Sequence, residues 1–187
     1  IMEYLDGGDL GALAKTRGAL PVETAVEYLL QACEALAEAH AMGIVHRDLK
    51  PSNLFVATRA DGTPSVKVLD FGISKITGMG ASGADLGMTK TTTIMGSPLY
   101  MSPEQMASSK DVDARTDIWA LGAILFELLT GRVPFQADTI TQLCAMILQQ
   151  RAEPLRNFRP DAPEGLQEVI HRCLEKDRNL RYANVAE

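Results

Sequence analysis

The stretch that decides the fold runs from His46 to Gly72 and has the sequence HRDLKPSNLFVATRADGTPSVKVLDFG. Residues 54–58 and 66–69 are apolar or β-branched runs, and Asp61-Gly62 between them is a dipeptide typical of a tight turn. The pattern predicts a β-hairpin. Because a hairpin brings its two ends together, side chains just before the first strand and just after the second are expected to meet.

Three acidic or amide side chains occupy those two ends. Asp48 and Asn53 precede the first strand, and Asp70 follows the second. Mg²⁺ prefers oxygen ligands, usually one or two carboxylates completed by substrate phosphates and water, so Asn53 and Asp70 are candidate metal ligands. Asp48 is then free to orient an attacking hydroxyl, and Lys50 supplies positive charge where a transferring phosphoryl group needs it.

These residues resemble the catalytic machinery of eukaryotic-type (Hanks-type) serine/threonine protein kinases. The family pattern H-R-D-L-x-x-x-N is matched by His46, Arg47, Asp48, Leu49 and Asn53, and D-F-G is matched by Asp70-Phe71-Gly72. Either tripeptide alone would be weak evidence, but the two motifs in order on one hairpin are specific. The resemblance is greatest to bacterial members.

The resemblance implies ATP-dependent phosphorylation of protein serine or threonine residues. The implied catalytic residues are Asp48, Lys50, Asn53 and Asp70, with ATP and Mg²⁺, or Mn²⁺ in its place, as cofactors. Implied nucleotide contacts are Met2, Glu3, Leu5, Asp9 and Phe55, together with Lys50, Asn53 and Asp70. Protein substrates are the expected partners, with self-association for autophosphorylation.

Composition is compatible with one globular domain and excludes some partners. The 187 residues are 46% apolar and 22% charged, and the net charge of −6 gives no broad basic surface for nucleic acid. The odd number of cysteines, Cys33, Cys144 and Cys173, predicts buried reduced thiols and an intracellular compartment. The longest apolar run, 118–129, is too short to span a membrane. We therefore expect a cytoplasmic kinase domain, with any membrane anchor outside this segment.

The chain is expected to be a fragment that begins in the linker between two kinase lobes. Residues 1–5 predict a strand, Asp6-Gly7-Gly8 predicts a turn, and a helical pattern begins at Leu10. No G-x-G-x-x-G or V-A-I-K motif is present. The expected fold is mainly α with a small β-hairpin, a kinase-like C-terminal lobe over 1–187 without the small N-terminal lobe. Alone, it is expected to bind ATP weakly and to be inactive.

Several helices are predicted around the hairpin. Residues 21–43 and 113–130 carry long apolar faces, the second capped by Asp113 and ended by Gly131, and two amphipathic segments follow over 140–148 and 166–174. His40 is interpreted as structural or solvent-facing, without a ligand role. Asp117 is either a first-turn acid or, as the resemblance implies, the anchor of the catalytic-loop backbone. His46 is implied to pack behind Phe71.

The segment between Asp70 and Glu104 corresponds to the activation loop of the family. A regulatory phosphate is implied on Thr91, Thr89 or Thr93, where it would pair with Arg47. Ser97 is implied to face the substrate. Ser102-Pro103-Glu104 stands where the family has A-P-E, and Arg181 is implied to pair with Glu104.

Two other functional hypotheses come from different classes. The first is a pseudokinase or docking scaffold that keeps the fold without catalysis, and the second is an interaction module built on the helices after Asp138. A scaffold has no chemical need for an intact catalytic set, which favours the enzyme.

Overall fold

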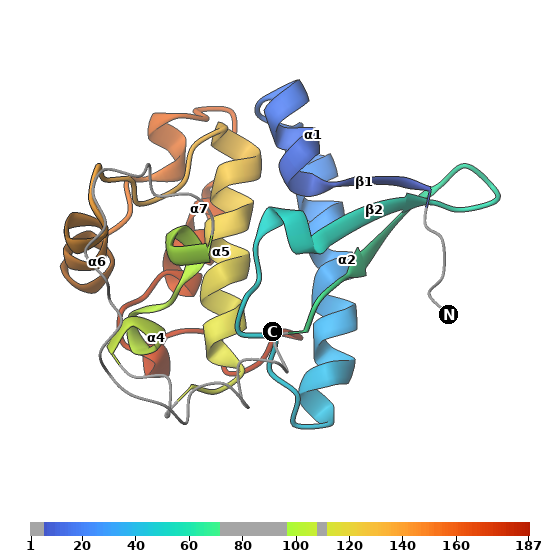
Figure 1. Ribbon diagram of the computed structural model, residues 1–187. Helices are drawn as coiled ribbons and strands as arrows, with labels where there is room; N and C mark the ends of the chain where they lie inside the picture. The colour runs from blue at the N-terminus through green and yellow to red at the C-terminus, as the bar shows by residue number, and fades with distance from the viewer. Residues whose placement is uncertain (1–5, 72–96, 108–111) are drawn as a thin grey trace.

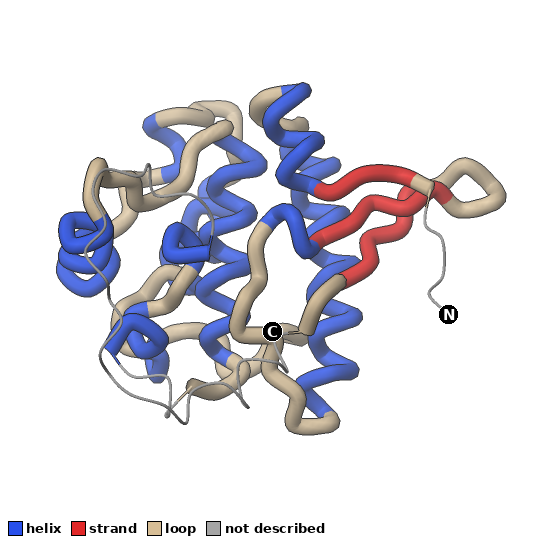
Figure 2. Tube along the Cα trace, in the orientation of Figure 1, coloured by secondary structure: helices blue, strands red, loops and turns tan. Residues whose placement is uncertain are grey.

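The computed structural model describes residues 6–71, 97–107 and 112–187. The described part is mainly helical, with one three-stranded antiparallel sheet at one side of the helices (Figures 1 and 2). The helices are α1 (Leu10–Arg17), α2 (Val22–Ala41), α4 (Pro103–Ala107), α5 (Arg115–Thr130), α6 (Ile140–Gln149) and α7 (Glu164–Cys173), and the strands are β1 (Gly7–Asp9), β2 (Leu54–Thr58) and β3 (Pro64–Val68).

The predicted β-hairpin is formed by β2 and β3. Phe55 pairs with Lys67 and Val56 with Val66, and Gly62 in the connecting turn has a φ of 82°, which favours glycine. The turn is held by Asp61, whose carboxylate accepts a hydrogen bond from the Thr63 backbone N–H at 2.9 Å. The second strand begins at Pro64 and ends at Val68, slightly earlier than the apolar pattern indicated.

The prediction of a turn at residues 6–8 was wrong in part, because Gly7–Asp9 forms β1 on the outer side of β2. Gly7 has a φ of 147°, and a Cβ there would overlap the carbonyl oxygen of Val56. Two glycines disfavour a strand in isolation, but the absence of side chains lets this backbone approach and pair with β2. Asp9 then ends the strand and caps α1, accepting from the Ala12 N–H at 2.8 Å.

Helix α5 occupies the middle of the helical part (Figure 1) and is buried nearly all round. Trp119, Ile124 and Phe126 are at most 1% exposed, and α5 contacts both α2 and α7. The helix ends as predicted at Gly131, which has a φ of 72°. The helix begins at Arg115, with Ala114 rather than the predicted Asp113 at the N-cap position. The Asp113 carboxylate accepts hydrogen bonds from the backbone N–H and the guanidinium of Arg115.

The apolar faces of α6 and α7 are less completely buried than the sequence pattern predicted. Leu143 and Ile147 of α6 are fully buried, but Ile140 is 46% and Leu148 44% exposed. On α7, Ile170 and Cys173 are buried, while Val169 is 38% exposed. Because each helix lies at the edge of the molecule, only its innermost positions reach the core.

The prediction of three buried thiols was correct for Cys173 only, since Cys33 and Cys144 are half-buried. Within the described ranges, all three are free of disulfide bonds. Burial raises the pKa of Cys33 to about 11 and that of Cys173 to about 12, so both remain protonated thiols at neutral pH.

Among the helices of the described residues, none combines the length and the apolar character that crossing a membrane requires.

The absence of a side chain at Gly122 allows α5 and α7 to pack closely. A Cβ at this position would lie 2.5 Å from the Cβ of Cys173. We expect Gly122→Ala to lower the free energy of unfolding by about 1–3 kcal/mol through overpacking. Urea denaturation, followed by the fluorescence of the single tryptophan, Trp119, measures this loss.

Gly165→Ala in α7 is the matched control, because nothing lies within 4 Å of its Cβ position. Helix propensity predicts that this control is neutral or stabilising by up to about 1 kcal/mol. Equal unfolding free energies for the two variants would contradict the close contact at Gly122.

Candidate active site

The loop that carries Asp48 is held in place by Asp117 in the first turn of α5. The two carboxylate oxygens of Asp117 accept hydrogen bonds from the backbone N–H groups of His46 and Arg47, each at 2.9 Å. Asp117 is fully buried, so these bonds are shielded from water. The geometry is that of a backbone anchor.

His40 is a further partner of this carboxylate that sequence reasoning missed. Its Nε2 lies 2.8 Å from Asp117 Oδ2, although 77 residues separate them in the chain. His40 Nδ1 is buried and has no hydrogen-bond partner among the described residues. An Nε2–H tautomer fits best, because it donates to the carboxylate and leaves no N–H unpaired at Nδ1. No local sequence signal marked this contact.

The backbone turns sharply at Arg47, where φ is 65°. The Arg47 carbonyl oxygen accepts a hydrogen bond of 2.7 Å from Gln105 Nε2 of α4. Arg47 Nε is buried without a hydrogen-bond partner in the part of the chain that the structure describes. Arg47 therefore adopts a left-handed backbone conformation that tertiary hydrogen bonds hold at its N–H and at its carbonyl oxygen. Sequence reasoning did not identify the role of Gln105.

Asp48, Lys50 and Asn53 lie together on this loop. Lys50 Nζ is 3.2 Å from Asp48 Oδ2, and Asn53 Nδ2 donates to the Asp48 carbonyl oxygen at 2.9 Å. Asn53 is 5% exposed and lies in a single 3-10 turn, Pro51–Asn53, just before β2. Because its amide nitrogen is used in this bond, the Oδ1 atom is the one left to accept or to ligate.

Asp70 is joined to this group through the end of β3. The Leu69 N–H donates to the Asn53 carbonyl oxygen at 2.8 Å, so the two ends of the hairpin are in direct contact. The Leu69 carbonyl oxygen lies 2.9 Å from His46 Nε2. Asp70 itself has a φ of 55°, which turns the chain immediately after the strand.

The His46 ring is fully buried between the loop and the residue after Asp70. Its centroid lies 4.9 Å from that of Phe71, with the rings tilted by 46°. His46 therefore packs against Phe71 and bonds the β3 end at the same time.

The described residues include two of the expected nucleotide contacts outside the loop. Asp9 and Phe55 are partners in the β1–β2 register. The Asp9 carboxylate is already engaged as the cap of α1. Several other expected site residues lie outside the described residues, namely Met2, Glu3, Leu5, Thr89, Thr91 and Thr93. Ser97 begins a 3-10 turn, Ser97–Tyr100, that leads to α4.

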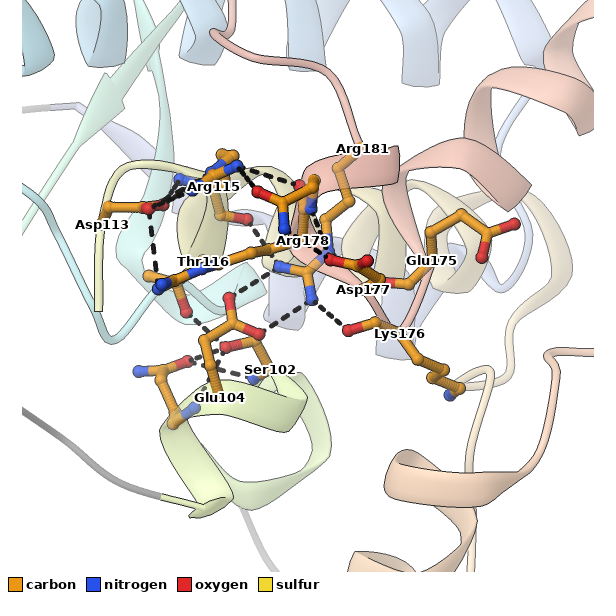
Figure 3. Close-up of polar contacts among 12 residues, drawn as sticks. Ser102, Glu104, Asp113, Arg115, Thr116, Glu175, Lys176, Asp177, Arg178 and Arg181 are labelled. Atoms are coloured by element: carbon orange, nitrogen blue, oxygen red, sulfur yellow. Dashed lines mark hydrogen bonds and ion pairs between the residues drawn. The ribbon is translucent and has the colours of Figure 1, made fainter. Parts of the chain in front are cut away.

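A bidentate ion pair fixes α4 to the C-terminal part of the chain. Arg181 Nη1 and Nη2 lie 2.7 and 2.8 Å from the two Glu104 oxygens (Figure 3). The remaining Arg181 donors bond the carbonyl oxygens of Glu175, Arg115 and Lys176. Arg181 is 3% exposed, so its charge depends on Glu104 for compensation.

Helix α4 is also bonded to α5. The Ser102 and Thr116 hydroxyls lie 2.6 Å apart, and both residues are buried. Gln105 extends from the same helix to the Arg47 carbonyl oxygen. The Glu104 pair thus supports a helix that contacts the catalytic loop directly.

The oxygen atoms of Asn53 and Asp70 suit a hard cation whose remaining ligands are phosphates and water. Across 6–71, 97–107 and 112–187, no group of three or more His, Cys, Asp or Glu side chains is arranged to hold a metal. One amide oxygen from Asn53 and one carboxylate from Asp70 are the kind of partial set that Mg²⁺ uses when phosphates and water complete its coordination.

Glu104→Gln should destabilise the fold in a pH-dependent way. Burial alone would raise the pKa of Glu104, but the hydrogen bonds and charge of Arg181 outweigh it and lower the pKa below 4.5. A lowered folded-state pKa means that the ion pair stabilises above the unfolded pKa and that this contribution is lost as the pH falls through the folded pKa. We expect a loss of about 3–5 kcal/mol at pH 7.

The difference in unfolding free energy between the wild type and Glu104→Gln should shrink as the pH falls through the acid range below 4.5. Urea denaturation over that range measures it. Glu153→Gln, at an exposed position, is the control and should change stability by less than about 0.5 kcal/mol throughout. A difference that stays constant with pH would show that the Glu104 charge is not the source.

Comparison with known proteins agrees with this arrangement. Residues 1–186 match the protein kinase domain family. The chain is 44% identical over its whole length to serine/threonine-protein kinase Pkn1 of Myxococcus xanthus, of which it covers 26%. It is 35% identical to serine/threonine-protein kinase PknB of Mycobacterium leprae, of which it covers 28%. The chain therefore spans about a quarter of the length of these curated relatives.

Among solved structures, the chain is similar to a crystal structure of Rad53 1-466 in complex with AMP-PNP. The TM-score is 0.77 and the sequences are 30% identical, over 99% of this chain and 43% of that one. The match to the family model over nearly every residue and the shared fold lead to one conclusion, with bacterial serine/threonine-protein kinases among the similar proteins: the chain belongs to the protein kinase family.

Proposed function

We propose that the protein carrying this chain transfers the γ-phosphoryl group of ATP to serine or threonine hydroxyls of protein substrates. The observation that carries the proposal is the catalytic loop itself. Asp48, Lys50 and Asn53 lie in mutual contact on a backbone that the buried Asp117 carboxylate fixes through two hydrogen bonds. Such fixed geometry matters because phosphoryl transfer depends mainly on positioning and charge stabilisation.

Asp48 is proposed to accept or orient the proton of the attacking hydroxyl. Its carboxylate is beside the Lys50 ammonium, with Nζ 3.2 Å from Oδ2. The lysine supplies positive charge for the oxygens of the transferring group. The Asn53 bond to the Asp48 carbonyl oxygen holds the backbone that carries the base.

Asn53 and Asp70 are proposed to hold the divalent metal, Mg²⁺ or Mn²⁺, that accompanies ATP. When bound, the metal would neutralise phosphate charge. The chain's own contribution is to keep the two oxygen ligands close, through the Leu69–Asn53 backbone bond at the ends of the hairpin. The solved relative Rad53 is described with AMP-PNP, an ATP analogue, which supports the choice of nucleotide.

Asp48→Asn should abolish most phosphate transfer while leaving ATP binding intact. The amide cannot take up the hydroxyl proton, so we expect kcat to fall by about 10²–10⁴-fold with little change in KM for ATP. Transfer from radiolabelled ATP to a protein substrate measures the rate. Asp138→Asn, which removes an exposed carboxylate, is the matched control and should retain full activity.

A residual Asp48→Asn rate within roughly tenfold of the wild type would contradict the role of a general base. Partner binding that persists without any transfer in the wild type would instead favour a scaffold.

We also propose that phosphorylation of the segment after Asp70 controls this site. Arg47 adjoins Asp48, and its buried Nε has no hydrogen-bond partner among the described residues. A phosphate adds about two negative charges and three strong acceptors, which a guanidinium can bind in a bidentate manner. Thr91 is the first candidate for the modified residue, followed by Thr89 and Thr93. Modification of one copy by another would require transient self-association.

Replacing Thr89 and Thr91 together by alanine should lower activity roughly tenfold or more, because the charged partner of Arg47 is lost. Phosphatase treatment of the wild type should have the same effect, and Thr92→Ala is the control from the same segment. If mass spectrometry shows that these threonines are unmodified in active protein, the proposed phosphorylation switch is wrong. The assignment of Asp48 would not be affected.

A further inference from the structure

A cavity outside the candidate active site lies between the segment after α6 and the end of α7. It has a volume of about 120 Å³ and is lined by Arg151, Ala152, His171, Leu174, Glu175 and Lys176. The lining includes two cationic side chains and a histidine but only one carboxylate. None of these residues belongs to the catalytic loop or to the hairpin.

Two nitrogen atoms of this lining lack hydrogen-bond partners. His171 Nε2 and Lys176 Nζ are both buried, and neither has a partner among the residues that the structure describes. The Lys176 side chain points away from the Arg181–Glu104 pair (Figure 3). Its ammonium instead lies 4.1 Å from the centroid of the Phe135 ring and 4.8 Å from that of Trp119.

The aromatic rings compensate the ammonium only in part. A cation over a ring recovers only part of the free energy that a buried, charged donor loses when it has no hydrogen-bond acceptor. Burial, followed by the nearby charge of Arg181, lowers the pKa of Lys176 to about 8, and Glu175 opposes this shift only weakly. The cavity therefore contains positively charged and N–H donor groups that a bound anion could pair with.

The arrangement of donors indicates the class of acceptor. Arg151 comes from one chain segment, and His171 and Lys176 come from another, so two segments of the chain contribute donors to the lining. A tetrahedral oxyanion offers several acceptor oxygens in different directions, and guanidinium and ammonium groups are its usual partners. A planar carboxylate offers two oxygens and satisfies fewer of these donors.

We propose that the cavity formed by Arg151, His171 and Lys176 binds a small tetrahedral oxyanion of the size of phosphate. Binding would draw the Lys176 ammonium toward the anion and away from the two aromatic rings. The neighbouring carbonyl oxygens of Glu175 and Lys176 bond Arg181, so the site lies directly behind the ion pair that fixes α4.

The test uses the chain's own tryptophan, because Trp119 contacts the Lys176 ammonium. Inorganic phosphate is titrated into the full chain at constant ionic strength, with Trp119 emission and the Tm as readouts. We expect a saturable change in emission and a rise in Tm, since a ligand that binds only the native state stabilises it. Sulfate should act like phosphate, and chloride and acetate should not.

Two variants address the site and two are controls. Lys176→Met and Arg151→Gln should each weaken phosphate binding by roughly tenfold or more, because each removes a charge-assisted contact. The exposed Arg151 provides a variant that does not disturb the core. Lys67→Met, an exposed lysine on β3, should keep the response, and Lys50→Met should keep it as well because Lys50 lies on the catalytic loop.

The outcomes separate the alternatives. A response retained in both Lys176→Met and Arg151→Gln would overturn the proposal, as would one that chloride reproduces. Loss of the response in Lys50→Met alone would assign the phosphate to the catalytic loop and also overturn it. An equal effect of acetate would overturn the tetrahedral class.

Discussion

The candidate site depends on one buried carboxylate. Asp117 accepts hydrogen bonds from two consecutive backbone N–H groups of the catalytic loop and from the His40 side chain. These bonds tie a loop with a left-handed arginine to the first turn of the most buried helix. Without this acceptor, the N–H groups of His46 and Arg47 would lose their hydrogen-bond partner, and the loop would lose the contacts that hold its conformation.

A second support reaches the same loop from the opposite side. Arg181 neutralises Glu104, Glu104 belongs to the short helix α4, and Gln105 of that helix bonds the Arg47 carbonyl oxygen. The backbone N–H of Arg47 is therefore bonded to α5, and its backbone carbonyl oxygen is bonded to α4. Asp48, the proposed general base, follows immediately, so the backbone that carries it is held by contacts from two elements distant in sequence.

Much of the architecture was predictable from local patterns. The hairpin over β2 and β3 followed from its two apolar or β-branched runs and from Asp61-Gly62, and the long helices followed from their apolar faces and from Gly131. Predictions failed where contacts with segments distant in the sequence determined the local structure. The turn expected at Gly7 became a strand because β2 was available to pair with it, and the apolar faces of α6 and α7 proved only partly buried because of where these helices lie.

The sequence alone identified the chemical groups and their order, because motif spacing on a hairpin requires only local geometry. Asp48, Lys50 and Asn53 lie on one loop, and a backbone hydrogen bond joins Asn53 to Leu69, the residue before Asp70. The resemblance implied Asp117 as an anchor of that geometry, but only the tertiary structure added His40 and Gln105. His40 and Asp117 are 77 residues apart, and Gln105 is 58 residues from Arg47. Such contacts follow from helix packing in three dimensions, which no periodicity along the chain records, and they are what fixes the loop in one conformation.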